Sequence, residues 1–215
     1  MIYATKLAQV LLDAAFDTAC AISGITFMRA TSEEQIHDCW KIRHEIFVEK
    51  GYIQPKPNGM FSDAYDPFSI NILVKKHEHP IAATRLVFDS SEGFPTEHLF
   101  NINLGTEMRK KIAEVSRLVV SKGYRGGDRL IMLGIIRSIS RIAHDENVSH
   151  LMCNMPKRLK NYFKKFGIIF IELAEGEVLE SHKKARELIG GYFNQQILHP
   201  YLIDVIATKR KLGIS

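Results

Sequence analysis

Two charged residues stand in a segment that otherwise has the composition of a buried strand. Residues 114–121 read Glu-Val-Ser-Arg-Leu-Val-Val-Ser, and their β-branched content predicts a β-strand. Alternation divides this strand between two faces, with Glu114, Ser116, Leu118 and Val120 on one and Val115, Arg117 and Val119 on the other. Both faces are mostly apolar, which is typical of a strand covered on both sides. A charge buried in such a strand destabilises the fold by several kcal/mol unless it is paired.

A second apolar segment, residues 81–88, contains one arginine, Arg85. Charges in core strands indicate either a cleft beside the strands or an ion-pair network that is only structural. A carboxylate in an apolar strand can have a raised pKa, which suits a general base that works near neutral pH. Glu114 is therefore the candidate catalytic residue, and membership of a structural ion-pair network is the alternative.

A glycine-rich turn follows the first strand directly. Residues 122–128 read Lys-Gly-Tyr-Arg-Gly-Gly-Asp, and residues 129–147 have the apolar spacing of a helix, for which Asp128 is a candidate N-cap. Free backbone N–H groups and the helix dipole together favour an anion at such a junction. A tight turn that binds nothing is the equally weighted alternative.

Length and composition are those of an ordinary globular protein. The chain has 215 residues, enough for one well-buried core, and a net charge of +5. The basic excess fits an acidic partner or a phosphorylated ligand, and no nucleic-acid-binding motif is found. The three cysteines, Cys20, Cys39 and Cys153, are odd in number and widely spaced, which fits a reducing cytoplasm and predicts neither disulfides nor a zinc site.

The apolar segments are too short for a membrane span, which needs about 18 residues or more. The N-terminal stretch 7–22 is apolar but is interrupted by Asp13 and Asp17. We expect it to be a helix packed on the core, with a membrane-surface role as the minor alternative.

Periodicity along the chain predicts helices that alternate with strands. Helices are expected at 4–22, 32–48, 129–147 and 156–167, and strands at 24–30, 68–76, 80–88, 114–121, 148–154 and 168–173. Ser32 and Gln35 have the spacing of a capping box, and Pro156 suits the first turn of its helix. The result is an α/β or α+β class with a mixed sheet. We expect one domain over 1–215, with helix 4–22 and a helical tail at 182–213 as additions.

This order of elements resembles the GNAT acyltransferase fold, a mixed, mostly antiparallel, twisted sheet with a splayed central strand, flanked by helices. Such proteins bind the phosphopantetheine arm of an acyl thioester at the splayed strand and at the glycine-rich loop after it. The resemblance assigns that role to Leu118, Val119, Val120, Ser121, Arg125, Gly126 and Gly127. The general-acid tyrosine position of the family falls on Phe163, with Tyr162 one residue earlier.

A narrower resemblance is to the acyl-homoserine lactone synthases and the N-acyl amino acid synthases, which take the acyl chain from acyl carrier protein. Four of their motifs occur here in order: Arg43 with Phe47, Asp63-Ala64-Tyr65-Asp66, Arg85-Leu86, and Glu114-Val115-Ser116-Arg117. The resemblance implies that substrate is bound by Arg43, Phe47, Asp63, Asp66, Arg85, Ser116 and Arg117. The lactone-forming enzymes usually have a Trp soon after the Phe, where this chain has Tyr52, so the acyl amino acid branch is favoured.

These residues predict an N-acyltransferase that moves a fatty acyl chain from an acyl carrier protein thioester to the amino group of an amino acid or similar small amine. The donor would be acyl-phosphopantetheine, on the carrier protein or on coenzyme A, and no permanent cofactor, metal, nucleic acid or membrane span is expected. Three arginines and three carboxylates would balance in charge, as a buried cluster must.

Three alternatives remain: an acyl-homoserine lactone synthase, an ordinary acetyl-coenzyme A-dependent N-acetyltransferase, and a non-catalytic module that binds a carrier protein or nucleic acid. A long apolar tunnel beside Glu114 would favour the long-chain enzyme over the acetyltransferase. The absence of any cleft there would favour the non-catalytic module.

Overall fold

The computed structural model describes residues 2–100, 102–126, 129–173 and 198–212, and their side chains except those of residues 2–9 and 212. Its strands are β1 (Ile25–Arg29), β2 (Ser69–Lys76), β3 (His79–Phe88), β4 (Ile112–Val120), β5 (His150–Met155), β6 (Phe170–Glu172) and β7 (His199–Asp204). Its helices are α1 (Ile2–Ser23), α2 (Glu33–Glu49), α3 (Thr106–Arg109), α4 (Arg129–Asp145), α5 (Lys157–Lys164) and α8 (Val205–Leu212), with 3-10 turns η1 (Asp66–Phe68) and η2 (Lys122–Tyr124).

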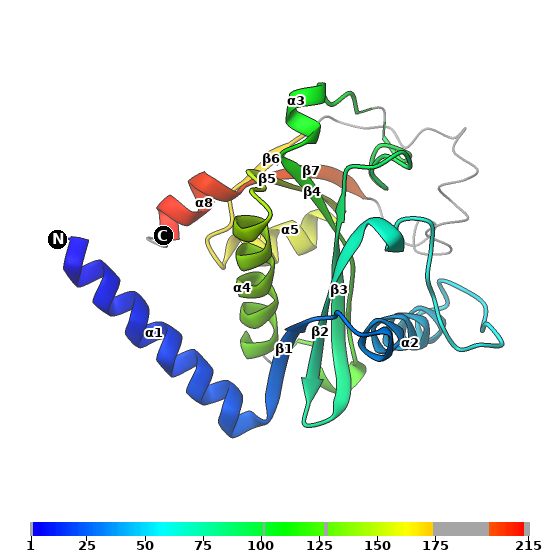
Figure 1. The fold of residues 1–215 in the computed structure, drawn as a ribbon, viewed down its shortest axis with the longest axis horizontal. Coiled ribbons are helices and arrows are strands. Elements are labelled where there is room, and N and C mark those ends of the chain that lie inside the picture. The colour runs from blue at the N-terminus through cyan, green and yellow to red at the C-terminus, as the bar shows by residue number, and fades with distance from the viewer. Residues whose placement is uncertain (1, 101, 127–128, 174–197, 213–215) are drawn as a thin grey trace.

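The strands form one sheet in the order β1-β2-β3-β4-β5-β7-β6 (Figure 1). Neighbouring strands are antiparallel except for β4 and β5, which are parallel. The predicted mixed, mostly antiparallel sheet is therefore confirmed. None of the described helices is long and apolar enough to cross a membrane.

The two central strands separate beyond their first residues. Pairing between β4 and β5 runs from Ile112 with His150 to Glu114 with Met152 and then stops. Both strands continue, β4 to Val120 and β5 to Met155, without further pairing between them. The sheet therefore opens into a V whose base lies at Glu114, and this is the splayed central strand that the sequence predicted.

A bulge in β4 changes which side chains share a face. Arg117 has a φ of 56°, in the left-handed region, and the pairing of β3 with β4 shifts between Ala83 and Arg85. Beyond the bulge, Val119 packs among the apolar residues of α2, whereas Leu118 and Val120 pack with those of α4. The predicted division of this strand into two faces is thus wrong after Ser116. Glu114 and Arg117, predicted on opposite faces, both face the α2 side.

Helices cover both faces of the sheet (Figure 1). On one side, α2 buries Cys39, Ile42 and Ile46 against β2 and β3. On the other, α4 packs Ile131 and Ile135 on β1 to β3. The capping box at the start of α2 is confirmed, because the Ser32 side chain accepts from the Gln35 N–H and the Gln35 side chain accepts from the Ser32 N–H.

The C-terminal prediction is partly wrong. Residues 182–197 lie outside the described part of the chain, but residues 199–204 of the predicted helical tail form strand β7. This strand lies between β5 and β6, so its partners come from distant segments, and a run of six residues does not reveal its conformation by periodicity. Only α8 confirms the helical prediction there. Pro156 is the N-cap of α5 rather than its first helical residue.

Candidate active site

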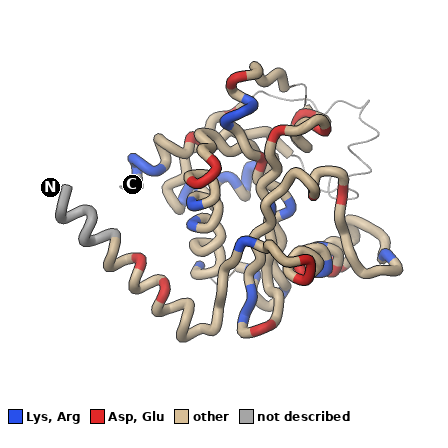
Figure 2. The backbone as a smooth tube through the Cα atoms, viewed as in Figure 1, with Lys and Arg blue, Asp and Glu red and all other residues tan. Residues whose placement is uncertain are grey.

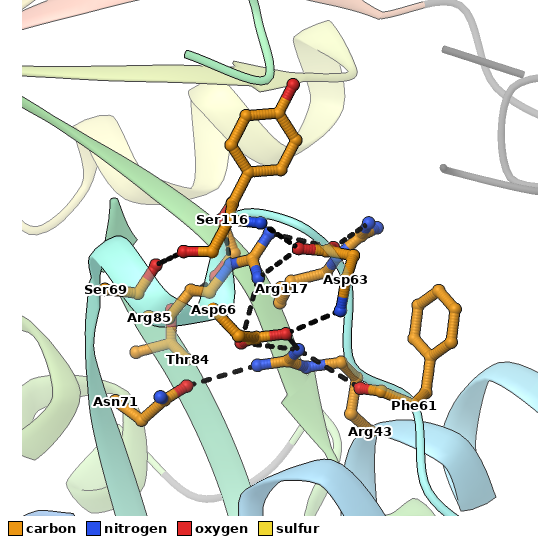
Figure 3. Close-up of polar contacts among 11 residues, drawn as sticks. Arg43, Phe61, Asp63, Asp66, Ser69, Asn71, Thr84, Arg85, Ser116 and Arg117 are labelled. Carbon is orange, nitrogen blue, oxygen red and sulfur yellow. Dashed lines mark hydrogen bonds and ion pairs between the residues drawn. The ribbon is translucent and has the colours of Figure 1, made fainter. Parts of the chain in front are cut away.

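Three arginines and two aspartates form a buried ion-pair cluster on the α2 side of the sheet (Figure 3). Arg43 lies 3.0 Å from Asp66, and Arg85 lies 2.6 Å from Asp63 and 2.9 Å from Asp66. Arg117 reaches Asp63 at 2.7 Å. The four motifs that contain these residues are therefore in contact, although they are far apart in the sequence.

Each arginine comes from a regular element, whereas Asp63 lies in the irregular segment before η1 and Asp66 is the first residue of η1. Arg43 projects from α2, Arg85 from β3 and Arg117 from β4. The Asp66 carboxylate also accepts from the Asp63 N–H at 2.8 Å, which closes a tight turn. The cluster thus fixes the segment between α2 and β2 over the sheet through arginine–carboxylate pairs.

Burial and charge set the ionisation of this cluster. Burial alone would raise the pKa of Asp63, but Arg117 and Arg85 outweigh it and hold that pKa below its usual value. Burial lowers the pKa of Arg43 to about 10, although Asp66 opposes this. Three guanidinium groups against two carboxylates give the cluster a formal net charge of +1.

Aromatic side chains lie against Arg117. Its guanidinium is 5.6 Å from the ring centre of Phe47 and 5.1 Å from that of Phe61. Ser116 lies beside it and accepts a hydrogen bond from the Arg85 Nε at 3.0 Å. Tyr52, in the place of the expected Trp, packs edge-on against Phe47 with 5.7 Å between ring centres.

Glu114 is fully buried and is held apart from the arginine cluster. Its two carboxylate oxygens accept from the Thr96 N–H at 2.9 Å and the Thr96 hydroxyl at 2.8 Å. Among the described residues Glu114 has no ion pair. The sequence predicted three arginines paired with three carboxylates, and the structure corrects this to three arginines paired with two carboxylates, Asp63 and Asp66. Burial raises the pKa of Glu114 to about 7, against the hydrogen bonds from Thr96, which lower it.

Thr96 joins the two arms of the V. Its hydroxyl, which donates to Glu114 on β4, also accepts from the Asn154 side-chain amide on β5 at 2.8 Å. Thr96 is itself fully buried. Neither Thr96 nor Asn154 was predicted as a site residue. Thr96 lies in an irregular segment, and nothing in its local sequence indicates a partner 18 positions further on.

A cavity of about 750 Å³ fills the V and extends between the sheet and α4. From α4 it is lined by four apolar side chains, Met132, Ile135, Ile136 and Ile139, and by the polar side chains of Arg137, Ser140, Arg141 and His144. Its polar lining includes Glu114, Tyr65, Arg85, Ser116, Arg117 and Asn154. The cavity lies beside Glu114, and both apolar and charged side chains line it.

The predicted site residues divide into three groups by their relation to this cavity. It is lined by Glu114, Phe47, Arg85, Ser116, Arg117, Leu118, Val119, Val120 and Arg125. Outside its lining lie Arg43, Asp63, Asp66, Ser121 and Gly126, of which the first three support the lining arginines. Gly127, like Asp128, lies outside the described residues. Phe163, at the expected general-acid position, lines the cavity, whereas Tyr162 is exposed and does not.

The glycine-rich turn is anchored to α2. Arg125 makes two 2.8 Å hydrogen bonds to the Glu49 carboxylate and donates to the Val120 carbonyl at 2.6 Å. The N–H groups of Tyr124 and Arg125 are used within the turn, by the carbonyls of Ser121 and Lys122. Any anion bound there must therefore use other N–H groups of the turn. In the described part of the chain, no group of acidic, histidine or cysteine side chains is arranged to hold a metal ion.

Comparisons with solved structures find the same fold in several acyltransferases. The acyl-homoserine lactone synthase LasI is 15% identical, with 84% of this chain and 89% of that chain covered and a TM-score of 0.62. The N-acyl amino acid synthase FeeM from uncultured soil microbes is 10% identical, with 87% and 93% covered and a TM-score of 0.65. The coenzyme A-dependent lactone synthase BjaI is 17% identical, with 88% and 89% covered and a TM-score of 0.62.

At these identities the structures show the fold alone, and a search of curated proteins finds no match. The family is shown by a sequence model, that of the N-acyl amino acid synthase FeeM, which matches residues 38–171. The match covers more than half of the chain and contains all four motifs that the sequence analysis identified, from Arg43 to Arg117. This chain is an acyltransferase of the FeeM N-acyl amino acid synthase family.

Proposed function

We propose that this enzyme transfers a fatty acyl chain from the phosphopantetheine thioester of an acyl carrier protein to the amino group of an amino acid or similar small amine. The observation that carries the proposal is the position of Glu114: a fully buried carboxylate at the base of the V, facing a large apolar cavity. An amine must lose a proton to attack a thioester well. A base with a pKa of about 7 is matched to that task near neutral pH.

The proton and electron pairs can be followed through one transfer. The neutral amine forms the C–N bond at the thioester carbonyl with its nitrogen lone pair, and Glu114 takes the one proton that this nitrogen loses on becoming an amide. Backbone N–H groups of β4 beyond Glu114, which β5 does not pair, are candidates to stabilise the oxyanion. The C–S bond then breaks, and the thiolate leaves with a pKa of about 8.5, so a dedicated acid such as the missing tyrosine at Phe163 is not required.

The acceptor is proposed to bind beside the arginine cluster. The cluster carries one net positive charge, and two of its arginines, Arg85 and Arg117, line the cavity next to Glu114. Guanidinium groups hold carboxylates in defined geometry. The α-carboxylate of an amino acid would thus lie at the arginines and its amine near Glu114, while the acyl chain occupies the apolar part of the cavity.

Replacing Thr96 by Val is expected to shift the pH dependence of kcat/KM. The hydroxyl hydrogen bond stabilises the Glu114 carboxylate, so its loss should raise the pKa of Glu114 above about 7. Since the base acts when deprotonated, the acidic limb of the profile should move to higher pH by about one pH unit. A pH–rate profile of the purified variant measures this.

Thr96→Ser is the matched control. It keeps the hydroxyl, so the acidic limb of its pH–rate profile should lie close to that of the parent. A Thr96→Val enzyme with reduced rate but an unmoved limb would mean that Thr96 only shapes the fold and does not tune Glu114.

An acyl carrier protein donor predicts a strong salt dependence. Carrier proteins are acidic, and Lys157 and Arg158 are exposed at the start of α5, with Arg158 also lining the cavity. Two further basic residues, Arg125 and Lys160, are less exposed than Lys157 and Arg158, so we place docking on the latter two. The rate with acyl carrier protein should fall steeply as salt rises, because association between exposed charges is screened beyond about 8–10 Å.

A neutral, truncated acyl-pantetheine thioester is the matched donor, and its rate should hardly change over the same salt range. BjaI is described as coenzyme A-dependent, so the corresponding acyl-coenzyme A belongs in the same titration. Equal salt dependence of carrier-bound and truncated donors would remove the carrier protein from the proposal and leave the transfer reaction itself in place.

A further inference from the structure

The outward face of α1 is apolar and uncharged over the part whose side chains are described. Val10, Leu11, Leu12 and Ile22 are 62%, 62%, 65% and 82% exposed. The residues between them on this face are alanines and Thr18. An ordinary surface helix has its apolar stripe against the core and its charges in water.

Of the acidic side chains of α1, Asp13 faces α4, whereas Asp17 is 74% exposed beside the apolar face. Asp13 lies 2.7 Å from Arg137, and Asp17 lies 4.0 Å from the same guanidinium. The Phe16 ring stacks beneath Arg137, 4.3 Å from its ring centre to the guanidinium carbon. Cys20, one turn further on, is buried. Helix α1 therefore uses Asp13 for packing and turns an apolar surface outward, which calls for an apolar partner.

Helix α8 adds positive charge on the same side of the molecule. It has an exposed apolar residue, Ile206, at 51%, and its last turn contains Lys209, Arg210 and Lys211. Figure 2 shows this basic stretch on the same side of the molecule as α1. The cavity reaches both helices, because Asp13 of α1 and Lys209 of α8 line it. Arg137 and Arg141 of α4 line it as well.

We propose that the outward face of α1 and the basic end of α8, called here the α1–α8 flank, dock the enzyme on an anionic phospholipid bilayer. An anionic membrane interface binds a surface of this kind in two ways. It buries the apolar side chains, and its negative charge attracts the lysines and arginines beside them. A second copy packed on α1 would cover the apolar residues but would leave the cationic turn of α8 unexplained. The bilayer accounts for both.

The flank borders the end of the cavity that Asp13 of α1 and Lys209 of α8 line. Provided that the proposed long-chain function is right, an acylated product is an amphiphile with low solubility in water, and docking would place this end of the cavity against a phase that accepts it. Vesicle binding is measured without any substrate. A lack of binding would therefore not contradict the proposed acyl transfer reaction.

Co-sedimentation of the full chain with vesicles tests the proposal. We expect binding to phosphatidylcholine vesicles that contain phosphatidylglycerol, much weaker binding to phosphatidylcholine alone, and release as salt rises. The double variant Arg210→Glu/Lys211→Glu should lower the partition coefficient by about 25-fold or more, since each basic residue near an anionic surface is worth about 5-fold. Leu11→Glu/Ile22→Glu should abolish binding by placing charge in the apolar face.

Matched variants separate docking from non-specific charge effects. Lys164→Glu/Lys165→Glu on α5 makes the same charge change at exposed sites, and Met108→Glu/Ile171→Glu places the same side chain at exposed apolar positions on α3 and β6. Both should bind vesicles like the parent. Equal loss in the flank and control variants, or no binding of the parent to anionic vesicles, overturns the proposal. A further outcome also overturns the proposal: the parent self-associates in light scattering without binding vesicles, and Leu11→Glu/Ile22→Glu abolishes the self-association. That result would assign the apolar face of α1 to a second copy of the chain.

Discussion

Replacement of Glu114 by Gln is expected to lower turnover by roughly 10²–10⁴-fold, the usual size of a general-base contribution. The amide keeps the shape of the side chain and can still accept from the Thr96 N–H, but it takes no proton from the attacking amine. KM for the acyl donor should change little, because the donor does not depend on the charge of Glu114. Steady-state kinetics of the purified variant at saturating amine measure the effect.

The same substitution should not unfold the protein. Burial raises the pKa of Glu114 from its ordinary value of 4.5 to about 7, so the folded state holds this proton more tightly than the unfolded state. That contribution to stability is complete below pH 4.5 and is lost as pH rises through about 7. Glu114→Gln should therefore melt no lower than the parent at pH 8. Glu146→Gln, in an exposed pair with Arg29, is the control and should have parental turnover. Near-parental turnover of Glu114→Gln would leave Glu114 as a structural charge.

Arg85→Ala is expected to reduce the free energy of unfolding by about 3–5 kcal/mol, because the side chains of Asp63 and Asp66 are buried and each loses its direct ion pair with Arg85. Arg85 is fully buried and contacts both Asp63 and Asp66. The two aspartates would be left with Arg43 and Arg117, each of which reaches only one of them. Arg117→Ala should have a smaller effect in the same direction. Denaturant unfolding of each variant gives the values.

Arg29→Ala is the matched surface change, since its pair with Glu146 is exposed, and it should cost less than about 1 kcal/mol. Arg85→Lys keeps the charge but loses the paired geometry toward Asp63, so we expect it to fall between the parent and Arg85→Ala. Unfolding curves of Arg85→Ala and Arg117→Ala that coincide with the parent would mean that solvent compensates these arginines and that the buried cluster does not hold the loop.

The sequence predicted the parts of the site that have a local signature. Glu114, Arg85 and Arg117 are conspicuous because charges are rare in apolar strands, whereas Asp63 and Asp66 were identified only through the family resemblance. The sequence also predicted the capping box of α2, because the side chains of Ser32 and Gln35 bind backbone groups only a few residues away.

The parts that the sequence did not predict depend on distant partners. The bulge at Arg117 arises from the register between β3 and β4, so nothing in the strand itself reveals that Glu114 and Arg117 face the same side. Thr96 was missed because its contacts to Glu114 and Asn154 join an irregular segment to two strands. Strand β7 was taken for helix because its ladder is supplied by β5 and β6.

One competition assay tests the central claim most directly. The purified enzyme is given acyl carrier proteins loaded with chains of increasing length, acetyl-coenzyme A and a mixture of amino acids, and the amide products are identified by mass spectrometry. The account predicts long-chain N-acyl amino acids from the parent and their near disappearance with Glu114→Gln. Products that carry only the acetyl group, or long-chain products formed equally by Glu114→Gln, would contradict it.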